Sequence, residues 1–204
     1  MKGDNRSFWQ KMSLIYKKFM SGAEPTYAAL CERIRPSLQK DMEVLELACG
    51  TGQLSYPLAG EVRHWIATDF STAMLRRARG GGPWPEGMSF EPQDATDISY
   101  PDESFDAVVM ANALHIMPWP EKALAEVKRV LKPGGFLFAP TFVKGVSKSN
   151  KLRTKLIQLM GLKVFHNYDA DGLCETVSAA GFTITEREML GTSLMPLCYV
   201  KAVK

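Results

Sequence analysis

Long hydrophobic runs are missing from this sequence of 204 residues. A membrane-spanning helix needs about eighteen consecutive apolar residues, and no stretch reaches that length, so we expect no stable membrane insertion. The N-terminus, Met1 to Gln10, also has no apolar core of the kind that a secretory signal contains. Both absences lead us to expect a cytoplasmic protein.

Cysteine is scarce and scattered. The four cysteines form no Cys-x-x-Cys pair, so the sequence predicts neither a metal site nor a disulfide framework. Reduced, buried thiols are the expectation for all of them. They are Cys31, Cys49, Cys174 and Cys198.

A strong excess of one charge is missing as well. The formal net charge is +3, which is too small to predict binding to nucleic acid. Internal repeats, low-complexity tracts and long linkers are also absent. With 46% hydrophobic residues, the chain suits one compact domain over residues 1–204. The sequence does not determine its oligomeric state.

Short apolar runs alternate along the chain with segments of helical period. This alternation is typical of βαβ units and a largely parallel sheet with helices on both faces, which makes three layers. We expect strands at residues 43–48, 62–68, 88–91, 105–110, 136–141, 182–189 and 197–203. We expect helices at residues 7–19, 25–35, 151–160 and 171–180. Three more are expected in the middle of the chain: one from the glycine turn toward Gly60, one capped by Ser71 and ended by the break at residues 80–83, and one that starts near Pro118 or Pro120 and is ended by residues 132–135.

The last two expected strands have no helix between them. A parallel pair would need a longer crossover, so residues 182–189 and 197–203 are predicted to form an antiparallel hairpin. The sheet is therefore predicted to be mixed.

Distinctive residues follow the first four expected strands. In an open α/β sheet, ligands bind at the carboxyl ends of the strands. We therefore predict one crevice shared by four positions. These are Gly50 and Gly52, Asp69, Asp94 with Ala95, and the stretch that begins at Asn112.

The glycine turn and the acidic residues around it carry the chemistry. Gly50-Thr51-Gly52 could begin a dinucleotide fingerprint, but Ser55 stands at the third glycine position, and a tight turn is the alternative. Glu46 interrupts an apolar strand just before this turn. A carboxylate facing the crevice would repel a pyrophosphate and favour a ligand with an ammonium group. Alternatively, Glu46 points away and pairs with a surface lysine.

Asp69 closes the second strand. An acidic residue about twenty positions after the glycine turn can accept hydrogen bonds from ribose hydroxyls, which predicts a nucleoside ligand. The alternative is a capping role toward the helix that begins near Ser71.

Taken together, these segments resemble the class I methyltransferases, and most of all the group around the ubiquinone and menaquinone C-methyltransferases. The resemblance covers about residues 40–141. It rests on the segments 44–52 (Val-Leu-Glu-Leu-Ala-Cys-Gly-Thr-Gly), 69–75 (Asp-Phe-Ser-Thr-Ala-Met-Leu), 93–95 (Gln-Asp-Ala), 105–109 (Phe-Asp-Ala-Val-Val) and 131–135 (Leu-Lys-Pro-Gly-Gly).

The resemblance implies a doubly wound, Rossmann-like sheet of seven strands, S-adenosylmethionine as the cofactor and S-adenosylhomocysteine as its product. It implies N-terminal helices over residues 1–40 that cover the cofactor site, a cofactor-binding core over residues 41–141, and a substrate-side part over residues 142–204. It also implies roles for single residues. The methionine moiety would be surrounded by Glu46, Ala48, Gly50, Gly52 and Asn112, and Tyr16 would close over the cofactor. Asp69 would bind the ribose. The adenine would be contacted by Phe70, Met74, Asp94 and Ala95.

Two features depart from the family pattern. A glycine commonly sits one or two positions after Gly52, where this chain has Gln53 and Leu54, and this predicts a less open helix entry. The chain is also short, so we expect it to lack the inserted segment that covers the substrate in larger members. Substrate selection is then expected from residues 1–24, 142–168 and 191–196.

The substrate-side segments leave two questions open. Six basic residues between positions 144 and 163 could meet an anionic substrate or a membrane, although a solvated helix face is the favoured interpretation. Five aromatic residues could form an apolar acceptor pocket or could belong to the core. They are Phe8, Trp9, Phe142, Phe165 and Tyr168. A small organic acceptor is the expectation, because little chain remains to grip a macromolecule.

Methyl transfer from a sulfonium depends mainly on positioning, and a base is needed only if the acceptor must lose a proton. His115 follows the fourth strand and is the candidate base; packing in place is the alternative. If it is the base, His115→Ala lowers turnover and leaves cofactor affinity intact.

Two other functions compete. An NAD(P)-linked oxidoreductase would need a hydride-transfer acid such as a Tyr-x-x-x-Lys pair, and none of the six tyrosines has a lysine four positions on. A regulatory protein would bind S-adenosylmethionine without an acceptor pocket.

Overall fold

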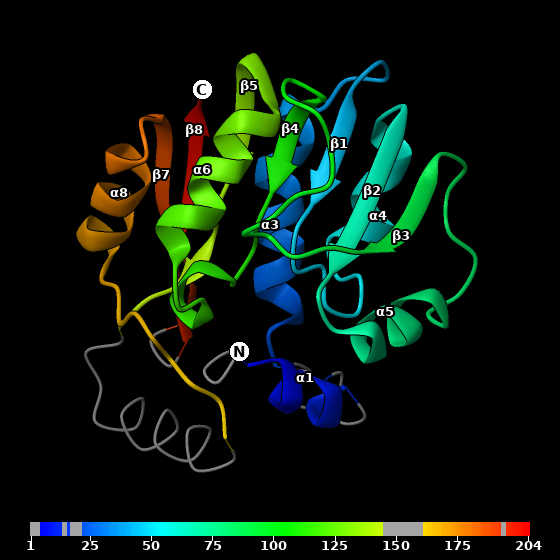
Figure 1. The fold of residues 1–204 in the computed structure, drawn as a ribbon, viewed down its shortest axis with the longest axis horizontal. Coiled ribbons are helices and arrows are strands. Elements are labelled where there is room, and N and C mark those ends of the chain that lie inside the picture. The colour runs from blue at the N-terminus through cyan, green and yellow to red at the C-terminus, as the bar shows by residue number, and fades with distance from the viewer. Residues whose placement is uncertain (1–4, 14–15, 17–21, 145–160, 193–194) are drawn as a thin grey trace.

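A computed structural model describes residues 5–13, 16, 22–144, 161–192 and 195–204, which form three layers around one eight-stranded sheet (Figure 1). The strand order is β3-β2-β1-β4-β5-β8-β6, and β7 pairs with β8. The strands are β1 (Glu43–Glu46), β2 (His64–Asp69), β3 (Met88–Pro92), β4 (Phe105–Val109), β5 (Leu131–Phe138), β6 (Thr141–Phe142), β7 (Thr183–Thr192) and β8 (Met195–Val203).

The mixed sheet predicted from the sequence is confirmed. Strands β3, β2, β1, β4 and β5 run parallel to their neighbours. Strand β8 runs antiparallel to β5 and to β7, which gives the predicted C-terminal hairpin. The prediction of seven strands differs from the structure by one strand, because the two-residue β6 pairs with β8 at the sheet edge.

Helices cover both faces of the sheet. The α-helices are α1 (Arg6–Met12), α3 (Glu24–Ile34), α4 (Ser55–Leu58), α5 (Thr72–Arg79), α6 (Pro120–Val130) and α8 (Ala170–Ala179). The described residues also form three 3-10 turns between helices and strands, η1 (Arg35–Ser37), η2 (Ala59–Glu61) and η3 (Leu114–Ile116). The expected helix at residues 7–19 is observed as α1, and most of its second half lies outside the described residues, as does the expected helix at 151–160.

Local signals in the sequence explain where two helices begin and end. Ser71 caps α5, because its Oγ accepts a hydrogen bond from the Met74 backbone N–H at 3.4 Å. Helix α8 begins after Asp169, whose Oδ1 accepts from the Gly172 N–H at 2.9 Å. It ends before Gly181, whose φ of +84° lies in the left-handed region that glycine adopts at low cost.

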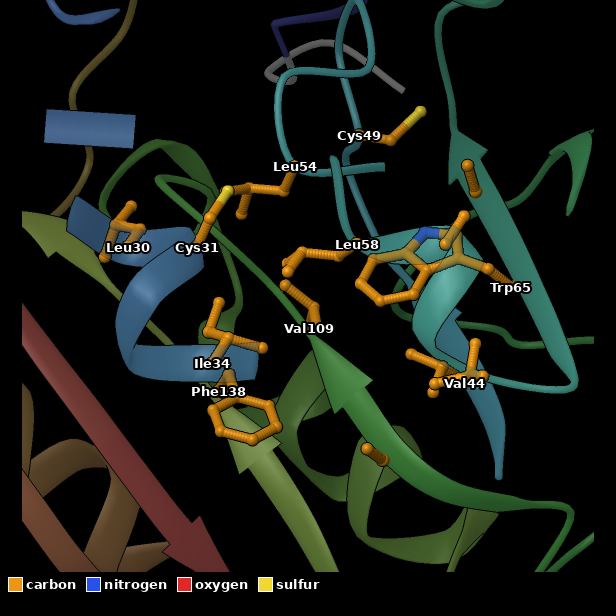
Figure 2. Close-up of a cluster of buried hydrophobic side chains, with 14 of the residues drawn as sticks. Leu30, Cys31, Ile34, Val44, Cys49, Leu54, Leu58, Trp65, Val109 and Phe138 are labelled. Carbon is orange, nitrogen blue, oxygen red and sulfur yellow. The ribbon is translucent and has the colours of Figure 1, made fainter. Parts of the chain in front are cut away.

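Two hydrophobic cores lie on opposite faces of the sheet. The first packs helices α3, α4 and α5 against the strands, and Figure 2 shows Ile34 of α3 beside Phe138 and the Cys31 thiol beside Leu54. The second packs α6 and α8 against the other face, where α6 stands in front of β5 and β8 and α8 lies beside β7 (Figure 1). Buried strands between two such layers explain the near-continuous apolar runs in the sequence.

Alternation along β1 decides which way Glu46, the second of its two acidic side chains, points. Val44 belongs to the first core, whereas Leu45 and Leu47 belong to the second. Side chains alternate across a strand, so Glu46 falls on the side of Val44, toward α4 and Trp65. This position makes Glu46 a buried carboxylate rather than a surface one, and it is 2% exposed.

The apolar face of α6 should contribute strongly to stability. Leu124 is fully buried in the second core together with Val127 and Val130 of the same helix. We expect Leu124→Ala to lower the free energy of unfolding by about 2–5 kcal/mol, because a cavity remains where the side chain was. Urea denaturation measures this, and Lys122→Ala on the exposed face of the same helix is the control. Equal losses from both variants would contradict this packing.

No helix in the described part of the chain is long and apolar enough to cross a membrane.

Candidate functional site

One cavity of about 340 Å³ lies at the carboxyl ends of β1, β2 and β4. In Figure 1 this is the edge of the sheet beside α1 and α5. The volume falls within the range of small-molecule sites. Its wall is formed by Asn5, Trp9, Tyr16, Tyr27, Glu46, Leu47, Ala48, Cys49, Gly50, Gln53, Leu54, Asp69, Phe70, Met74, Gln93, Asp94, Ala95, Thr96, Ala111, Asn112, Ala113, Ile116, Met117, Pro118 and Trp119.

The predicted crevice therefore exists, and most of the predicted residues meet in it. Glu46 and Asp69 share this cavity, as do the residues that follow the third and fourth strands. Two predicted residues, Gly52 and His115, do not contribute to the described wall.

The turn after β1 bends the backbone sharply around the cavity. Ala48 and Gly50 have φ angles of +54° and +60°, and Gly52 has +86°. A Cβ on Gly50 would lie 3.6 Å from the Tyr16 ring, so the bare backbone keeps this part of the wall close to the aromatic ring. A Cβ on Gly52 would lie 2.9 Å from the Tyr56 ring, so this glycine is required for packing at the start of α4. Its role toward a cofactor stays a prediction.

Asp69 ties the two turns of the site together. Its Oδ2 accepts a hydrogen bond from the Gly50 N–H at 3.0 Å, and its Oδ1 accepts from the Ser71 N–H at 2.8 Å. Burial raises the pKa of this carboxyl from 3.8 to about 6, although both N–H groups act in the opposite direction. Each carboxylate oxygen can still accept a further hydrogen bond.

Glu46 has neutral partners. Its Oε2 accepts hydrogen bonds from the Ser55 hydroxyl and from Trp65 Nε1, the latter at 2.9 Å. No described residue is hydrogen-bonded to Oε1. Burial raises the pKa of Glu46 from 4.5 to about 7, and the charge of Asp69 adds to this rise. Glu46 therefore does not pair with a surface lysine among the described residues, which was the alternative.

The wall beyond β2 and β3 combines apolar faces with a polar turn. Phe70 and Met74 line it from the start of α5. Opposite them, Asp94 Oδ1 accepts from the Thr96 N–H at 3.0 Å and from the Thr96 hydroxyl at 2.8 Å, which holds the turn that carries Ala95. This wall offers flat apolar contact together with polar groups at one edge.

Asn112 follows β4 in a left-handed conformation, with a φ of +54°. Its Oδ1 accepts from the Phe142 N–H at 3.0 Å, and its Nδ2 donates to the Tyr27 hydroxyl at 3.2 Å. Non-glycine residues with such φ angles are uncommon and cluster at functional sites. Asn112 and Ala48 both line the cavity.

The N-terminal segment closes one side of the cavity. Asn5 is 3% exposed; its Nδ2 donates to the backbone oxygens of Ile116 and Lys163 at 2.9 and 2.8 Å. The ring of Trp9 meets that of Tyr16 edge-on, with 5.7 Å between centroids. Hydrogen bonds thus hold three segments that are distant in the sequence together beside the cavity.

An apolar stretch forms the outer end of the cavity. Trp119 is 45% exposed and also lines the cavity, so this end reaches the surface. Of the five aromatic residues expected to form an acceptor pocket, Trp9 lines the described cavity, whereas Phe8 is buried and Phe142, Phe165 and Tyr168 are not part of the wall. Ile116, Met117 and Pro118 precede Trp119 in the chain and also line the cavity, and Trp9 lines it from the segment that Asn5 fastens to Ile116. We call these five apolar residues the outer end.

His115 lies in η3, beside the cavity wall. Its Nδ1 is buried without a hydrogen-bond partner in the described structure, and burial lowers the pKa of the ring to about 4. The ring is therefore neutral at physiological pH. Its role as a base stays a prediction.

Sequence reasoning missed several residues of the wall. Tyr27 fits the helical pattern of residues 25–35, and nothing in that pattern separates a ligand-facing tyrosine from a core one. Gln53 was noted as a departure from the family pattern, and its side chain lines the cavity. Asn5 had no local signal, because its partners lie far along the chain. Trp9, by contrast, was among the aromatic residues named for an acceptor pocket.

No group of three or more metal-ligating side chains is found among the described residues. All four cysteines are free thiols, three of them buried and Cys174 half-buried.

Known proteins resemble the part of the chain that carries most of the cavity wall. The model of the methyltransferase domain family matches residues 45–139. The chain is 44% identical over 92 residues to the demethylmenaquinone methyltransferase of Clavibacter sepedonicus, covering 45% of this chain and 38% of the relative. It is 33% identical over 169 residues to the demethylmenaquinone methyltransferase of Paenarthrobacter aurescens, covering 73% of this chain and 66% of the relative.

A solved structure shares the fold. It is the magnesium protoporphyrin IX methyltransferase of Synechocystis PCC 6803 with bound SAH, with a TM-score of 0.70 and 17% identity over 90% of this chain and 84% of that one. The chain spans less than two thirds of the length of either curated relative.

Proposed function

We propose that the chain is a class I methyltransferase whose methyl donor is S-adenosylmethionine, and that it transfers the methyl group of this cofactor to a small, apolar organic acceptor. S-adenosylhomocysteine is then the product. The observation that carries the proposal is the shared cavity of Glu46 and Asp69, two carboxylates from neighbouring strands. A cation joined to a nucleoside suits this pair.

The residues of the cavity fit the cofactor. Glu46 Oε1 has no partner among the described residues and can accept from the ammonium group of the amino-acid end. Asp69 can accept from the ribose hydroxyls while it keeps both backbone N–H groups. Phe70 and Met74 offer apolar contact to the adenine, and the turn at Asp94 and Ala95 offers polar contact at its edge.

The chemistry required of the protein is mainly positioning. The cofactor supplies a methyl group on a sulfonium, and the neutral thioether that remains after transfer is a good leaving group. Holding the reacting groups in line removes much of the entropy cost of the reaction. The two carboxylates would orient one end of the cavity, and the apolar outer end would hold the acceptor opposite.

The acceptor class follows from the outer end of the cavity. Its wall of Trp9, Ile116, Met117 and Trp119 favours an apolar ring system over a strongly charged molecule. The curated relatives are named for demethylmenaquinone, which supports a quinone-type acceptor.

Titration calorimetry combined with a transfer assay tests the proposal. We expect binding of S-adenosylmethionine and S-adenosylhomocysteine, no comparable binding of NADH, and transfer of a labelled methyl group to a quinone-type acceptor. Preferential binding of NADH would indicate an oxidoreductase instead. Cofactor binding without transfer to any acceptor in a broad screen would indicate a regulatory protein.

The candidate base has its own test. If His115 takes a proton from the acceptor, His115→Ala lowers kcat by about 10² to 10⁴. Its affinity for S-adenosylmethionine stays the same, because the ring is not part of the described cavity wall. Single-turnover transfer measures the first effect and calorimetry the second. An unchanged rate would remove His115 from the mechanism.

A further inference from the structure

Two tyrosine hydroxyls from separate parts of the chain meet inside the cavity. Tyr16 comes from the N-terminal segment and Tyr27 from α3, and both line the wall. Their hydroxyls are hydrogen-bonded to each other. Burial raises the pKa of both phenols, so each keeps its proton at physiological pH.

An amide group stands at each end of this pair. The Asn112 oxygen accepts from the Phe142 N–H at 3.0 Å, which fixes the amide so that its Nδ2 donates to the Tyr27 hydroxyl at 3.2 Å. The Gln53 oxygen accepts from the Thr51 hydroxyl at 3.2 Å, which leaves its NH₂ group for the bond with the Tyr16 hydroxyl. Both ends of the pair therefore receive a hydrogen rather than supply one.

Counting hydrogens shows that one phenolic O–H is left over. Two hydroxyls carry two hydrogens, and the bond between Tyr16 and Tyr27 uses one of them in either direction. The amides at the two ends are donors, so neither takes up the second hydrogen. No described residue accepts it. Buried polar hydrogens are nearly always bonded, and this one lines a ligand-sized cavity, so it should meet a ligand acceptor.

The positions of the two tyrosines indicate which hydroxyl faces the amino-acid end of the cavity. A Cβ on Gly50 would lie 4.0 Å from the Tyr16 hydroxyl, and the Gly50 N–H is bonded to Asp69, so Tyr16 lies beside the Asp69 turn. The Tyr27 hydroxyl is bonded to Asn112 instead, and besides burial the charge of Glu46 raises its pKa, so Tyr27 is the tyrosine on the Glu46 side. There the unpartnered Glu46 Oε1 is an acceptor and the Tyr27 hydroxyl is a donor. A donor and an acceptor side by side match a zwitterion.

We propose that Tyr27 binds the α-carboxylate of the cofactor through this O–H, next to the ammonium group at Glu46, and that Asn112 positions it by donating to the same oxygen. This inference rests on the proposed function and adds a recognition element to it. A nucleoside thioether that keeps the amine but lacks the carboxylate should lose this contact.

Calorimetry with two ligands tests the inference. S-adenosylhomocysteine carries both charges, and its decarboxylated analogue, 5′-deoxy-5′-(3-aminopropylthio)adenosine, carries the amine alone. We expect Tyr27→Phe to weaken the binding of S-adenosylhomocysteine by about tenfold or more, because a hydrogen bond to a charged group is lost. The affinity for the analogue should stay unchanged. Tyr16→Phe should keep the preference for the carboxylate, because Tyr27 retains both its hydrogen and its bond from Asn112.

Tyr56→Phe is the matched control, because the Tyr56 hydroxyl donates to the Ala78 backbone oxygen and does not line the cavity. Asn112→Asp is an independent variant that serves even if Tyr27→Phe fails to fold. Its new acceptor would capture the Tyr27 hydrogen and abolish the preference for the carboxylate. Equal losses for both ligands in Tyr27→Phe, or no loss, overturn this inference alone. No binding of S-adenosylhomocysteine by the unmodified protein overturns the proposed function as well.

Discussion

Asp69→Ala is expected to weaken the binding of S-adenosylmethionine by at least about 100-fold. Hydrogen bonds to a charged group contribute about 1.5–3 kcal/mol each, and the ribose would lose two of them. The variant also leaves the Gly50 and Ser71 N–H groups without their acceptor, so the turns on either side of the cavity lose their common anchor. Calorimetry and equilibrium dialysis measure the affinity.

Asp106 offers a matched control. It also accepts a backbone hydrogen bond, from the Glu43 N–H at 2.8 Å, and it pairs with Lys132, but it does not line the cavity. Asp106→Ala should therefore lower stability and leave cofactor affinity within about twofold, as a change outside the site does. Similar affinity losses in the two variants would mean that Asp69 acts through the fold and not through the ribose.

Glu46→Gln is expected to change how stability depends on pH. The folded protein holds the Glu46 carboxyl with a pKa of about 7, against 4.5 for an unperturbed group. Between these two values the folded state keeps a proton that the unfolded state has released. The free energy of unfolding therefore falls by about 1.4 kcal/mol per pH unit as the pH rises through this window. Below pH 4.5 this contribution is fully present.

Glutamine removes the titration and keeps an oxygen that can accept from Ser55 and Trp65. Relative to the unmodified protein, the variant should gain about 3 kcal/mol of stability between pH 4.5 and pH 8. Urea denaturation of the cofactor-free protein at a series of pH values measures this difference. Parallel pH profiles for the two proteins would show that Glu46 is not held protonated.

The same carboxyl couples cofactor binding to proton release. An ammonium group beside Glu46 favours its ionised form, so binding near pH 6 should release a proton that the cofactor-free protein holds. Calorimetry in two buffers with different heats of ionisation counts these protons. Compared with the unmodified protein, the Glu46→Gln variant should release fewer protons on cofactor binding and should bind S-adenosylmethionine more weakly.

Part of the site could be predicted because parallel strands end at a common edge. Gly50, Asp69, Asp94 and Asn112 were expected to share a crevice for this reason, and they do. Gly52 adds a second requirement to the same argument. Its spacing predicts a ligand contact, and the structure shows that packing also requires a glycine there, because a Cβ would lie 2.9 Å from the Tyr56 ring.

The partners of Glu46 could not be predicted. The sequence shows a carboxylate in an apolar strand and requires that it be satisfied in some way. Ser55 and Trp65 satisfy it from a helix and from a neighbouring strand. Tyr27, Asn5 and Gln53 were missed for a related reason, because the role of each depends on a contact with a residue on another element.

Periodicity, strand length and the turn residues determined the layers, the parallel core, the closing hairpin and the edge where ligands bind, because these depend on side-chain direction within one element. Tertiary structure decided which groups face Glu46, that the N-terminal segment closes over the cavity, and that two tyrosines share a hydrogen-bond chain between two amides. Such pairings depend on long-range packing, and a linear sequence contains no local signal for them.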